Sequence, residues 1–252
     1  MPRFFIQKEQ VNEDIISLRG EDAHHIARSL RMAVGDPLTV CDMQGMEYEG
    51  TIESFAEDRE VLVRVRHKRL SDREPNCRIT VFQALPKGDK LDTVIQKAVE
   101  CGASEIIPFE SERCVVRMKQ EAEQRKTERR SKIAVEAAKQ SGRSVLPQVL
   151  PTVSFDKMLE LAASCDVKLF CYEGDGTEPL GVALKKEKES LMKPSATVAI
   201  VIGSEGGFSL DEVAKAKAKG LCPIGLGKRI LRTETASGFV LSCLVYVTEL
   251  GG

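Results

Sequence analysis

The sequence predicts an α/β protein: a large carboxy-terminal domain built on a parallel sheet, and a small amino-terminal β-barrel. Three observations support this prediction. From residue 77 onward, apolar strand-like segments alternate with helical segments, as in a parallel sheet covered by helices. Residues 197–202 are continuously apolar and mostly β-branched, which is typical of a buried parallel strand. Residues 1–70 instead hold short alternating segments separated by turn signals, which favours a small barrel.

The amino-terminal domain is expected over residues 1–72. Its strands are expected at residues 3–7, 37–42, 47–55 and 60–68, where apolar and polar residues alternate. Gly35-Asp36 and Gln44-Gly45 mark turns, and one helical segment covers roughly residues 21–30. The polar, proline-containing residues 71–76 are expected to form the linker to the next domain.

The carboxy-terminal domain is expected over residues 77–252. Its strands are expected at residues 78–85, 105–109, 167–172, 197–202 and 222–226. Its helices are expected at residues 89–101, in the basic stretch that ends at residue 141, and at residues 155–163, 209–219 and 235–250. Ser154 is placed to cap the helix that follows it, and Ser209 with Glu212 forms a capping box.

The composition predicts a soluble globular protein, with 42% apolar and 30% charged residues. No apolar run approaches the roughly 20 residues of a membrane span, and the amino terminus does not read as a signal peptide. We therefore expect a cytoplasmic protein that contacts no membrane. The eight cysteines form no C-x-x-C pair and only three histidines are present, so we expect reduced thiols and no metal site.

Basic residues are concentrated in one part of a chain whose net charge is only −1. Residues 113–143 hold ten lysines and arginines against four glutamates. Such a local excess can bind phosphates. It can equally be a solvated helix with charge pairs such as Glu121 and Arg125, four residues apart. The pattern alone leaves both interpretations open.

Two glycine-containing loops each follow an apolar run. They are Gly-Ser-Glu-Gly-Gly at 203–207 and Leu-Gly-Lys-Arg-Ile-Leu-Arg-Thr-Glu-Thr-Ala at 226–236. In open α/β sheets, ligands bind at the carboxyl ends of strands, so the pair predicts a ligand site. Neither loop has the spacing of a P-loop or of a dinucleotide fingerprint. Glu205 would repel a pyrophosphate, but suits a ligand that carries positive charge or hydroxyl groups.

These two loops resemble those of the SPOUT methyltransferases. More closely, the chain is similar to the RsmE family, bacterial enzymes that methylate N3 of one uridine in 16S ribosomal RNA. The similarity extends to His24–Arg31, Leu85–Lys90, Gln96–Gly102, Ser111–Arg113 and Ala137–Arg143. One departure is Ser204, where the family usually has proline; serine keeps the backbone amide, so we expect binding to survive.

The resemblance implies a deep trefoil knot in the carboxy-terminal domain, S-adenosylmethionine (SAM) bound within it, and a homodimer formed through the knotted domain. It also implies a PUA-like amino-terminal barrel that binds RNA. The residues it assigns to the cofactor are Cys171, Tyr172, Glu173, Ile202, Gly203, Ser204, Glu205, Gly206, Gly207, Leu226, Gly227, Ile230, Leu231, Arg232 and Thr235.

The reaction at uridine N3 requires loss of the N3 proton before or as the methyl group arrives. Arg232 is our candidate to stabilise negative charge on the uracil oxygens. Glu205 or Glu234 is a candidate for the base, or for a residue that orients Arg232, and the base stays unassigned. Alternatively, Arg232 forms a salt bridge with one of these glutamates. Thr233 or Thr235 is expected to cap the last helix.

RNA contacts are expected from both domains, with 16S ribosomal RNA in the 30S subunit as the partner. His25, Arg28 and Arg31 fall on one side of the amino-terminal helical segment. The other candidates are Lys87, Arg113, Gln140 and Arg143. The target base would have to be flipped out to reach the methyl group. The alternatives are a SPOUT enzyme with another RNA target, such as a tRNA ribose, and a non-catalytic RNA-binding module.

Overall fold

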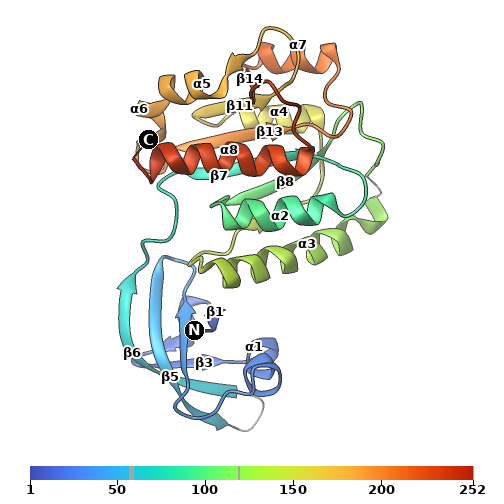
Figure 1. Ribbon diagram of the computed structural model, residues 1–252. Helices are drawn as coiled ribbons and strands as arrows, with labels where there is room; N and C mark the ends of the chain where they lie inside the picture. The colour runs from blue at the N-terminus through green and yellow to red at the C-terminus, as the bar shows by residue number, and fades with distance from the viewer. Residues whose placement is uncertain (57–59, 119, 252) are drawn as a thin grey trace. The chain divides into compact units, whose positions relative to one another are not determined.

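The protein is described by a computed structural model that covers residues 1–56, 60–118 and 120–251 (Figure 1). Lys119, part of the predicted basic stretch, lies outside these residues. The chain divides into two compact units: Met1–Glu74 with Ala138–Leu146, and Pro75–Ala137 with Pro147–Gly252. The first division falls inside the expected linker. The nine residues Ala138–Leu146, however, belong with the amino-terminal unit, a grouping that the predicted domain bounds did not contain.

The amino-terminal unit contains, among the described residues, one six-stranded sheet around a single apolar core. In sheet order the strands are β1 (Arg3–Phe5), β4 (Pro37–Cys41), β5 (Met46–Ala56), β6 (Glu60–Leu70), β3 (Ile15–Leu18) and β2 (Val11–Asn12). All neighbours are antiparallel except β1 and β4. The expected helix is a short α-helix, α1 (Gly20–His24), continued by a π-helical turn, η2 (His25–Ser29); a 3-10 turn, η1 (Lys8–Gln10), precedes β2.

Gly50 shows why β5 can pair closely with β6. A Cβ at this position would lie 2.6 Å from the Arg64 carbonyl oxygen, and the pairing register shifts between Glu49 and Gly50. A glycine is therefore required where the two long strands bend past each other.

The second unit is built, in its described residues, on an eight-stranded sheet in which every pair is parallel, so the predicted sheet type is confirmed. Its strands are β7 (Arg78–Ala84), β8 (Glu105–Glu110), β9 (Gln148–Val149), β10 (Val153–Ser154), β11 (Val167–Cys171), β12 (Glu178–Pro179), β13 (Thr197–Ile202) and β14 (Cys222–Gly225). The order is β10-β8-β7-β13-β11-β14-β12, with β9 also paired to β8. The central strand β13 is buried from Val198 to Ile202, as its continuous apolar sequence predicts.

Helices cover this sheet. They are α2 (Lys90–Glu100), α3 (Gln120–Ser141, whose last residues belong to the first unit), α4 (Phe155–Ala163), α5 (Leu180–Lys186), α6 (Lys188–Leu191), α7 (Leu210–Ala218) and α8 (Thr233–Thr248). Helices α2 and α8 lie side by side over one face (Figure 1). In the described part of the chain, no helix is long and apolar enough to cross a membrane.

The hydrogen bonds at the starts of three helices can be compared with the predicted capping residues. The Ser154 hydroxyl accepts a hydrogen bond from the Lys157 amide at 3.2 Å, and Ser209 and Glu212 form the reciprocal capping box, so both predictions are confirmed. The prediction for the last helix is wrong. It begins at Thr233, its N-cap residue Arg232 makes no side-chain capping bond, and the Thr233 hydroxyl is used elsewhere.

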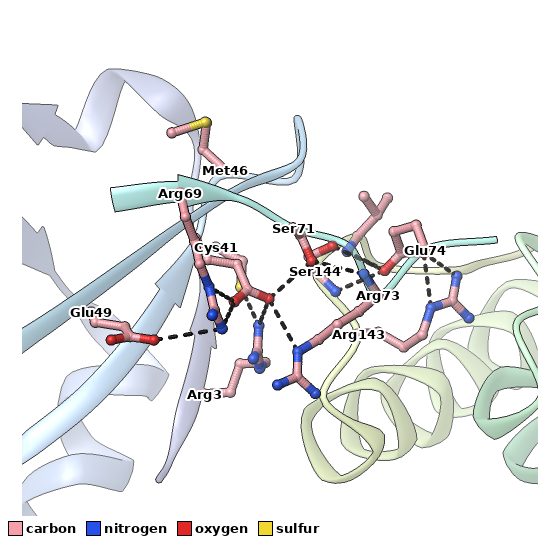
Figure 2. A network of polar contacts seen from close by, with 12 residues as sticks. Arg3, Cys41, Met46, Glu49, Arg69, Ser71, Arg73, Glu74, Arg143 and Ser144 are labelled. Atoms are coloured by element: carbon pink, nitrogen blue, oxygen red, sulfur yellow. Dashed lines mark hydrogen bonds and ion pairs between the residues drawn. The ribbon is translucent and has the colours of Figure 1, made fainter. Parts of the chain in front are cut away.

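Two carboxylates, the buried Glu47 and the partly buried Glu74, hold residues 71–74 and the end of α3 within the amino-terminal unit. Arg3, Arg69 and Arg73 converge on the fully buried Glu47 at 2.7, 3.1 and 3.7 Å, and Ser71 donates to the same carboxylate (Figure 2).

The second carboxylate, Glu74, accepts hydrogen bonds from the guanidinium of Arg143 at 2.6 Å and from the amides of Ser144 and Val145 (Figure 2). The expected linker is therefore fixed to the first unit by two sets of charge-assisted bonds.

Acid should weaken the contact at Glu74. Burial raises the pKa of this carboxyl, but Arg143 and the two amides outweigh burial and hold the pKa below its ordinary value. A carboxyl whose pKa is lower in the folded than in the unfolded state stabilises the fold fully at pH values above its unfolded-state pKa, about 4.3. This stabilisation is lost as the pH falls through the folded-state pKa. Urea unfolding of wild type and Glu74→Gln at pH 7 and below pH 4 should give stabilities that converge in acid. A constant difference between the two proteins would contradict this role.

Candidate active site

A cavity of about 560 Å³ lies where three neighbouring strands of the second unit end. Its walls are residues 171–174 and Thr177 from the end of β11, residues 202–205 with 207 and 208 from the end of β13, and residues 225–233 from the end of β14. Lys90, Arg113 and Ala236 complete the lining. The three segments follow the carboxyl ends of parallel strands, where α/β sheets bind their ligands. The volume is typical of a small-molecule site, about 300–1,000 Å³.

Most residues expected at the cofactor line this cavity. They are Cys171, Tyr172, Glu173, Ile202, Gly203, Ser204, Glu205, Gly207, Leu226, Gly227, Ile230, Leu231 and Arg232. Gly206 and Thr235 are not part of the lining. The Gly206 carbonyl accepts a hydrogen bond from Arg113 at 3.3 Å, and Thr235 is exposed in the first turn of α8.

The glycine loop at 203–207 is packed closely against its neighbours, so a side chain on Gly203 or Gly206 would have to displace them. A Cβ on Gly203 would lie 3.1 Å from the Phe208 ring, and one on Gly206 would lie 3.0 Å from the Arg113 carbonyl oxygen. Gly207 has φ +63°, a conformation that favours glycine. The loop is therefore held in one shape by its neighbours.

Glu205 contacts lysines rather than Arg232. Its carboxylate accepts hydrogen bonds from Lys90 Nζ at 2.6 Å and from the Lys87 amide at 3.2 Å. Burial raises the pKa of Glu205, but the bond from Lys90 and the backbone bonds outweigh it, and the net pKa is lowered. The hypothesis that Glu205 orients Arg232 is wrong for this structure, and a carboxyl with a lowered pKa is a weak general base.

Arg232 lines the cavity with an exposed side chain. Among the described residues, its guanidinium has no ion pair or hydrogen bond, so the alternative salt bridge to Glu205 or Glu234 does not form. Glu234 does not line the cavity, and its buried Oε2 atom has no hydrogen-bond partner in the described chain. Arg232 is thus free to bind a negatively charged group.

One part of the remaining wall, at the end of β11, is uncharged and partly aromatic. Burial raises the pKa of the Cys171 thiol to about 12, so this wall is uncharged at neutral pH. The Tyr172 ring is seated over Gly174, where a Cβ would approach it to 2.4 Å. Within the described residues, the backbone amides of Gly227–Leu231 donate no hydrogen bond, so they are available to a ligand or to water.

The residues expected to contact RNA are not all accessible. In the first unit, His25, Arg28, Arg31 and Gln140 are exposed, and the His25 ring packs edge-on against Phe4 at 6.4 Å between centroids. In the second unit, Lys87 is exposed and Arg113 lines the cavity.

Arg143 requires a correction. Its side chain is only 5% exposed and its guanidinium is bound to Glu74, so it is a structural residue of the first unit. The sequence shows its charge but not its partner Glu74, which lies 69 positions away.

Sequence reasoning also missed residues that shape the site. Gln83 is completely buried at the end of β7, and Lys90 holds Glu205. The available signal for Gln83 was a single amide side chain between the apolar residues Phe82 and Ala84.

Comparisons with known proteins agree with this architecture. A family model described as an RNA methyltransferase domain matches residues 73–245, and one described as an RNA methyltransferase PUA domain matches residues 18–65. A protein of Bacillus subtilis (strain 168) named Ribosomal RNA small subunit methyltransferase E is 38% identical over 99% of this chain and 98% of that protein.

Two solved structures carry a bound cofactor. A ribosomal RNA small subunit methyltransferase E from Neisseria gonorrhoeae, bound to S-adenosyl methionine, has a TM-score of 0.83 and 28% identity over 98% of both chains. A putative methyltransferase from Legionella pneumophila, in complex with SAM, has a TM-score of 0.82 and 30% identity over 96% of both chains. By these matches, over nearly its whole length, the chain belongs to the RNA methyltransferase family that includes the ribosomal RNA small subunit methyltransferase E proteins.

Proposed function

We propose that this protein transfers the methyl group of SAM to N3 of a specific uridine in 16S ribosomal RNA of the 30S subunit. The observation that carries the proposal is the cavity at the ends of β11, β13 and β14, whose wall contains Arg232 with no partner among the described residues. The relationship to structures with bound SAM supports the choice of cofactor.

The chemistry of the lining fits SAM. The uncharged Cys171 and the apolar Ile202 and Leu231 can contact the adenine ring, and the free amides of Gly227–Leu231 can bind its polar edge. Glu173, also in the lining, can interact favourably with the positive charge of the sulfonium or the amino group. When bound, SAM supplies an activated methyl group, so the protein needs to position and polarise the acceptor rather than activate the donor.

Arg232 provides the polarisation in this proposal. Removal of the N3 proton places negative charge on the uracil ring and its carbonyl oxygens. A guanidinium with no competing carboxylate can donate hydrogen bonds to those oxygens and favour the anion. Glu205, with its lowered pKa and its lysine partner, is disfavoured as the acceptor of the proton, and Glu234 lies outside the cavity lining, so the base stays unassigned.

We also propose the trefoil knot that the resemblance implies. The chain after β14 supports it. Thr233, at the start of α8, is hydrogen-bonded to Gly203 after β13 and to Gln83 of β7, although β11 lies between β14 and these two strands in the sheet. A homodimer through this domain is supported by Phe239 and Tyr246, which are 40% and 59% exposed on α8.

For the first unit we propose a PUA-like barrel closed around its single core, over the expected residues 1–72 together with the 138–146 segment. We propose His25, Arg28 and Arg31 as its RNA contacts, supported by their exposure. A cytoplasmic location follows if ribosomal RNA is the substrate.

The proposal is tested by incubating the protein and labelled SAM with undermethylated 30S subunits, naked 16S RNA or tRNA, then mapping the product. We expect label at N3 of one uridine in 16S RNA. Transfer only to tRNA would favour the alternative SPOUT activity, and SAM binding without transfer to any RNA would favour a non-catalytic module. Either result would refute the proposed function.

Gly174→Ala should weaken SAM binding by moving the Tyr172 ring. The new methyl group would lie 2.4 Å from that ring, which must leave its place in the cavity wall. An aromatic contact is worth about 0.5–1.5 kcal/mol, so the dissociation constant measured by calorimetry should rise about 2- to 10-fold. Gly181→Ala is the matched control, because a Cβ there meets no atom within 4 Å. Equal SAM affinity of the two variants would exclude the effect.

A further inference from the structure

One chain of hydrogen bonds joins β7, the glycine loop and the start of α8. Gln83 Nε2 donates to Thr233 Oγ1 at 2.8 Å, and Thr233 Oγ1 donates to the Gly203 carbonyl oxygen at 2.7 Å. Gln83 Nε2 also contacts the carbonyl oxygens of Ala84 and Gly203 at 2.9 and 3.3 Å. Gln83 is fully buried and Thr233 is 6% exposed.

The direction of these bonds is fixed. All three contacts of Gln83 Nε2 are with oxygen atoms, two of them carbonyls, so the side chain must present its amide nitrogen to them. Because the Thr233 hydroxyl gives its single proton to Gly203, its oxygen is left to accept from Gln83. Bonds that run in one direction through buried groups strengthen one another.

Stability alone does not explain this arrangement. Gln83 Oε1, Ser204 Oγ and Ser237 Oγ are buried and have no hydrogen-bond partner among the described residues. Unsatisfied buried polar atoms are unfavourable, and an apolar side chain like those of Val81 and Phe82 would avoid part of that cost. The Thr233 hydroxyl, at the first position of α8, makes its bond to the glycine loop rather than within its own helix.

The two residues that this chain connects both belong to the candidate active site. Gly203 opens the glycine loop, and Thr233 directly follows Arg232; both line the cavity. We propose that Gln83 and Thr233 are positioning residues, which lock the two cofactor loops together and fix Arg232 relative to the cavity. This inference rests on the proposed function and extends it to a residue outside the cavity lining, Gln83, and to its partner Thr233.

The test compares full-length variants by SAM calorimetry, by kinetics of transfer to 30S subunits, and by thermal unfolding. Thr233→Val removes the hydroxyl at nearly constant volume, and Gln83→Met removes the amide. Each should raise the dissociation constant and the KM for SAM about tenfold, as expected for the loss of one bond of this kind. Thr233→Ser keeps the hydroxyl and should stay within about twofold of wild type. The double variant should bind no more weakly than the weaker single variant, because both break one chain.

Matched controls separate positioning from general stability. Thr248→Val removes another buried hydroxyl of α8, which donates to the Leu244 carbonyl oxygen at 2.9 Å far from the loops. Ile79→Val perturbs the opposite end of β7. Both should lower the melting temperature and leave SAM affinity unchanged.

Two outcomes overturn the inference and can be told apart. Wild-type SAM affinity and KM in Thr233→Val and Gln83→Met, with only a lower melting temperature, would overturn the positioning role and leave the proposed function standing. Absence of SAM binding by the wild-type protein would overturn the proposed function and the positioning role together.

Discussion

Replacing Arg232 with alanine is expected to lower the rate of methyl transfer by about 10²–10³-fold, the usual effect of removing one electrostatic stabiliser from an active site. The side chain is exposed and unpaired among the described residues, so its removal should leave the fold and the SAM affinity nearly unchanged. Single-turnover transfer to 30S subunits and SAM calorimetry measure the two quantities separately. The loss should therefore appear in kcat and not in the binding of SAM.

Arg229→Ala is the matched control for this experiment. Arg229 is also exposed and lines the same cavity, three positions earlier in the loop. If its removal slows transfer as much as Arg232→Ala does, the effect is one of general positive charge. A wild-type rate for Arg232→Ala would remove Arg232 from the reaction altogether.

Glu47→Ala is expected to be the most destabilising single change in the first unit. The carboxylate is fully buried and receives Arg3, Arg69, Arg73 and Ser71, so its loss leaves the largely buried Arg3 without its ion-pair partner. Breaking a buried ion pair by removing one partner costs about 3–5 kcal/mol. Hydrogen exchange of the β5 and β6 amides reports on this unit separately and should show a matching loss of protection.

The control is Glu53→Ala, on the same strand β5. Glu53 pairs with Arg64 at 2.6 Å, but both side chains are more than one-third exposed. Such surface pairs contribute about 0–1 kcal/mol, so protection should hardly change. Equal effects of the two substitutions would show that the convergence of arginines on Glu47 adds no stability.

The long elements of the fold could be predicted from the sequence because their signals are local. The apolar run of β13, the Ser154 cap and the Ser209–Glu212 capping box each lie within a few residues and match the structure. The two-residue strands β9, β10 and β12 could not be predicted, because so few residues have no periodicity and pair only through the neighbouring strand.

The candidate site shows the same division. The backbone segments of the site could be predicted, because each glycine loop is continuous in sequence and the carboxyl ends of parallel strands lie at the same edge of the sheet. The partners of individual polar and charged side chains could not be predicted. Glu205 meets Lys90 across 115 positions, Gln83 meets Thr233 across 150, and Arg143 meets Glu74 across 69. A charge in a sequence does not reveal which distant group will neutralise it, so Arg143 was mistaken for an RNA contact and Glu205 for a partner of Arg232.

Arg143 and Ser144, the partners of Glu74, come late in the sequence, and this has a consequence for how the chain folds during synthesis. Residues 138–146 complete the first unit, and they are made only after 63 residues of the second unit, Pro75–Ala137, have been added. Domains usually fold in the order in which they emerge from the ribosome. The described apolar core of the amino-terminal unit comes entirely from residues 4–65, but Glu74 can meet Arg143 and Ser144 only once these have emerged, after the strands β7 and β8 have been made. The last contacts of the first unit therefore form only after part of the second unit has been made, and a chain that ends at residue 74 lacks part of the first unit.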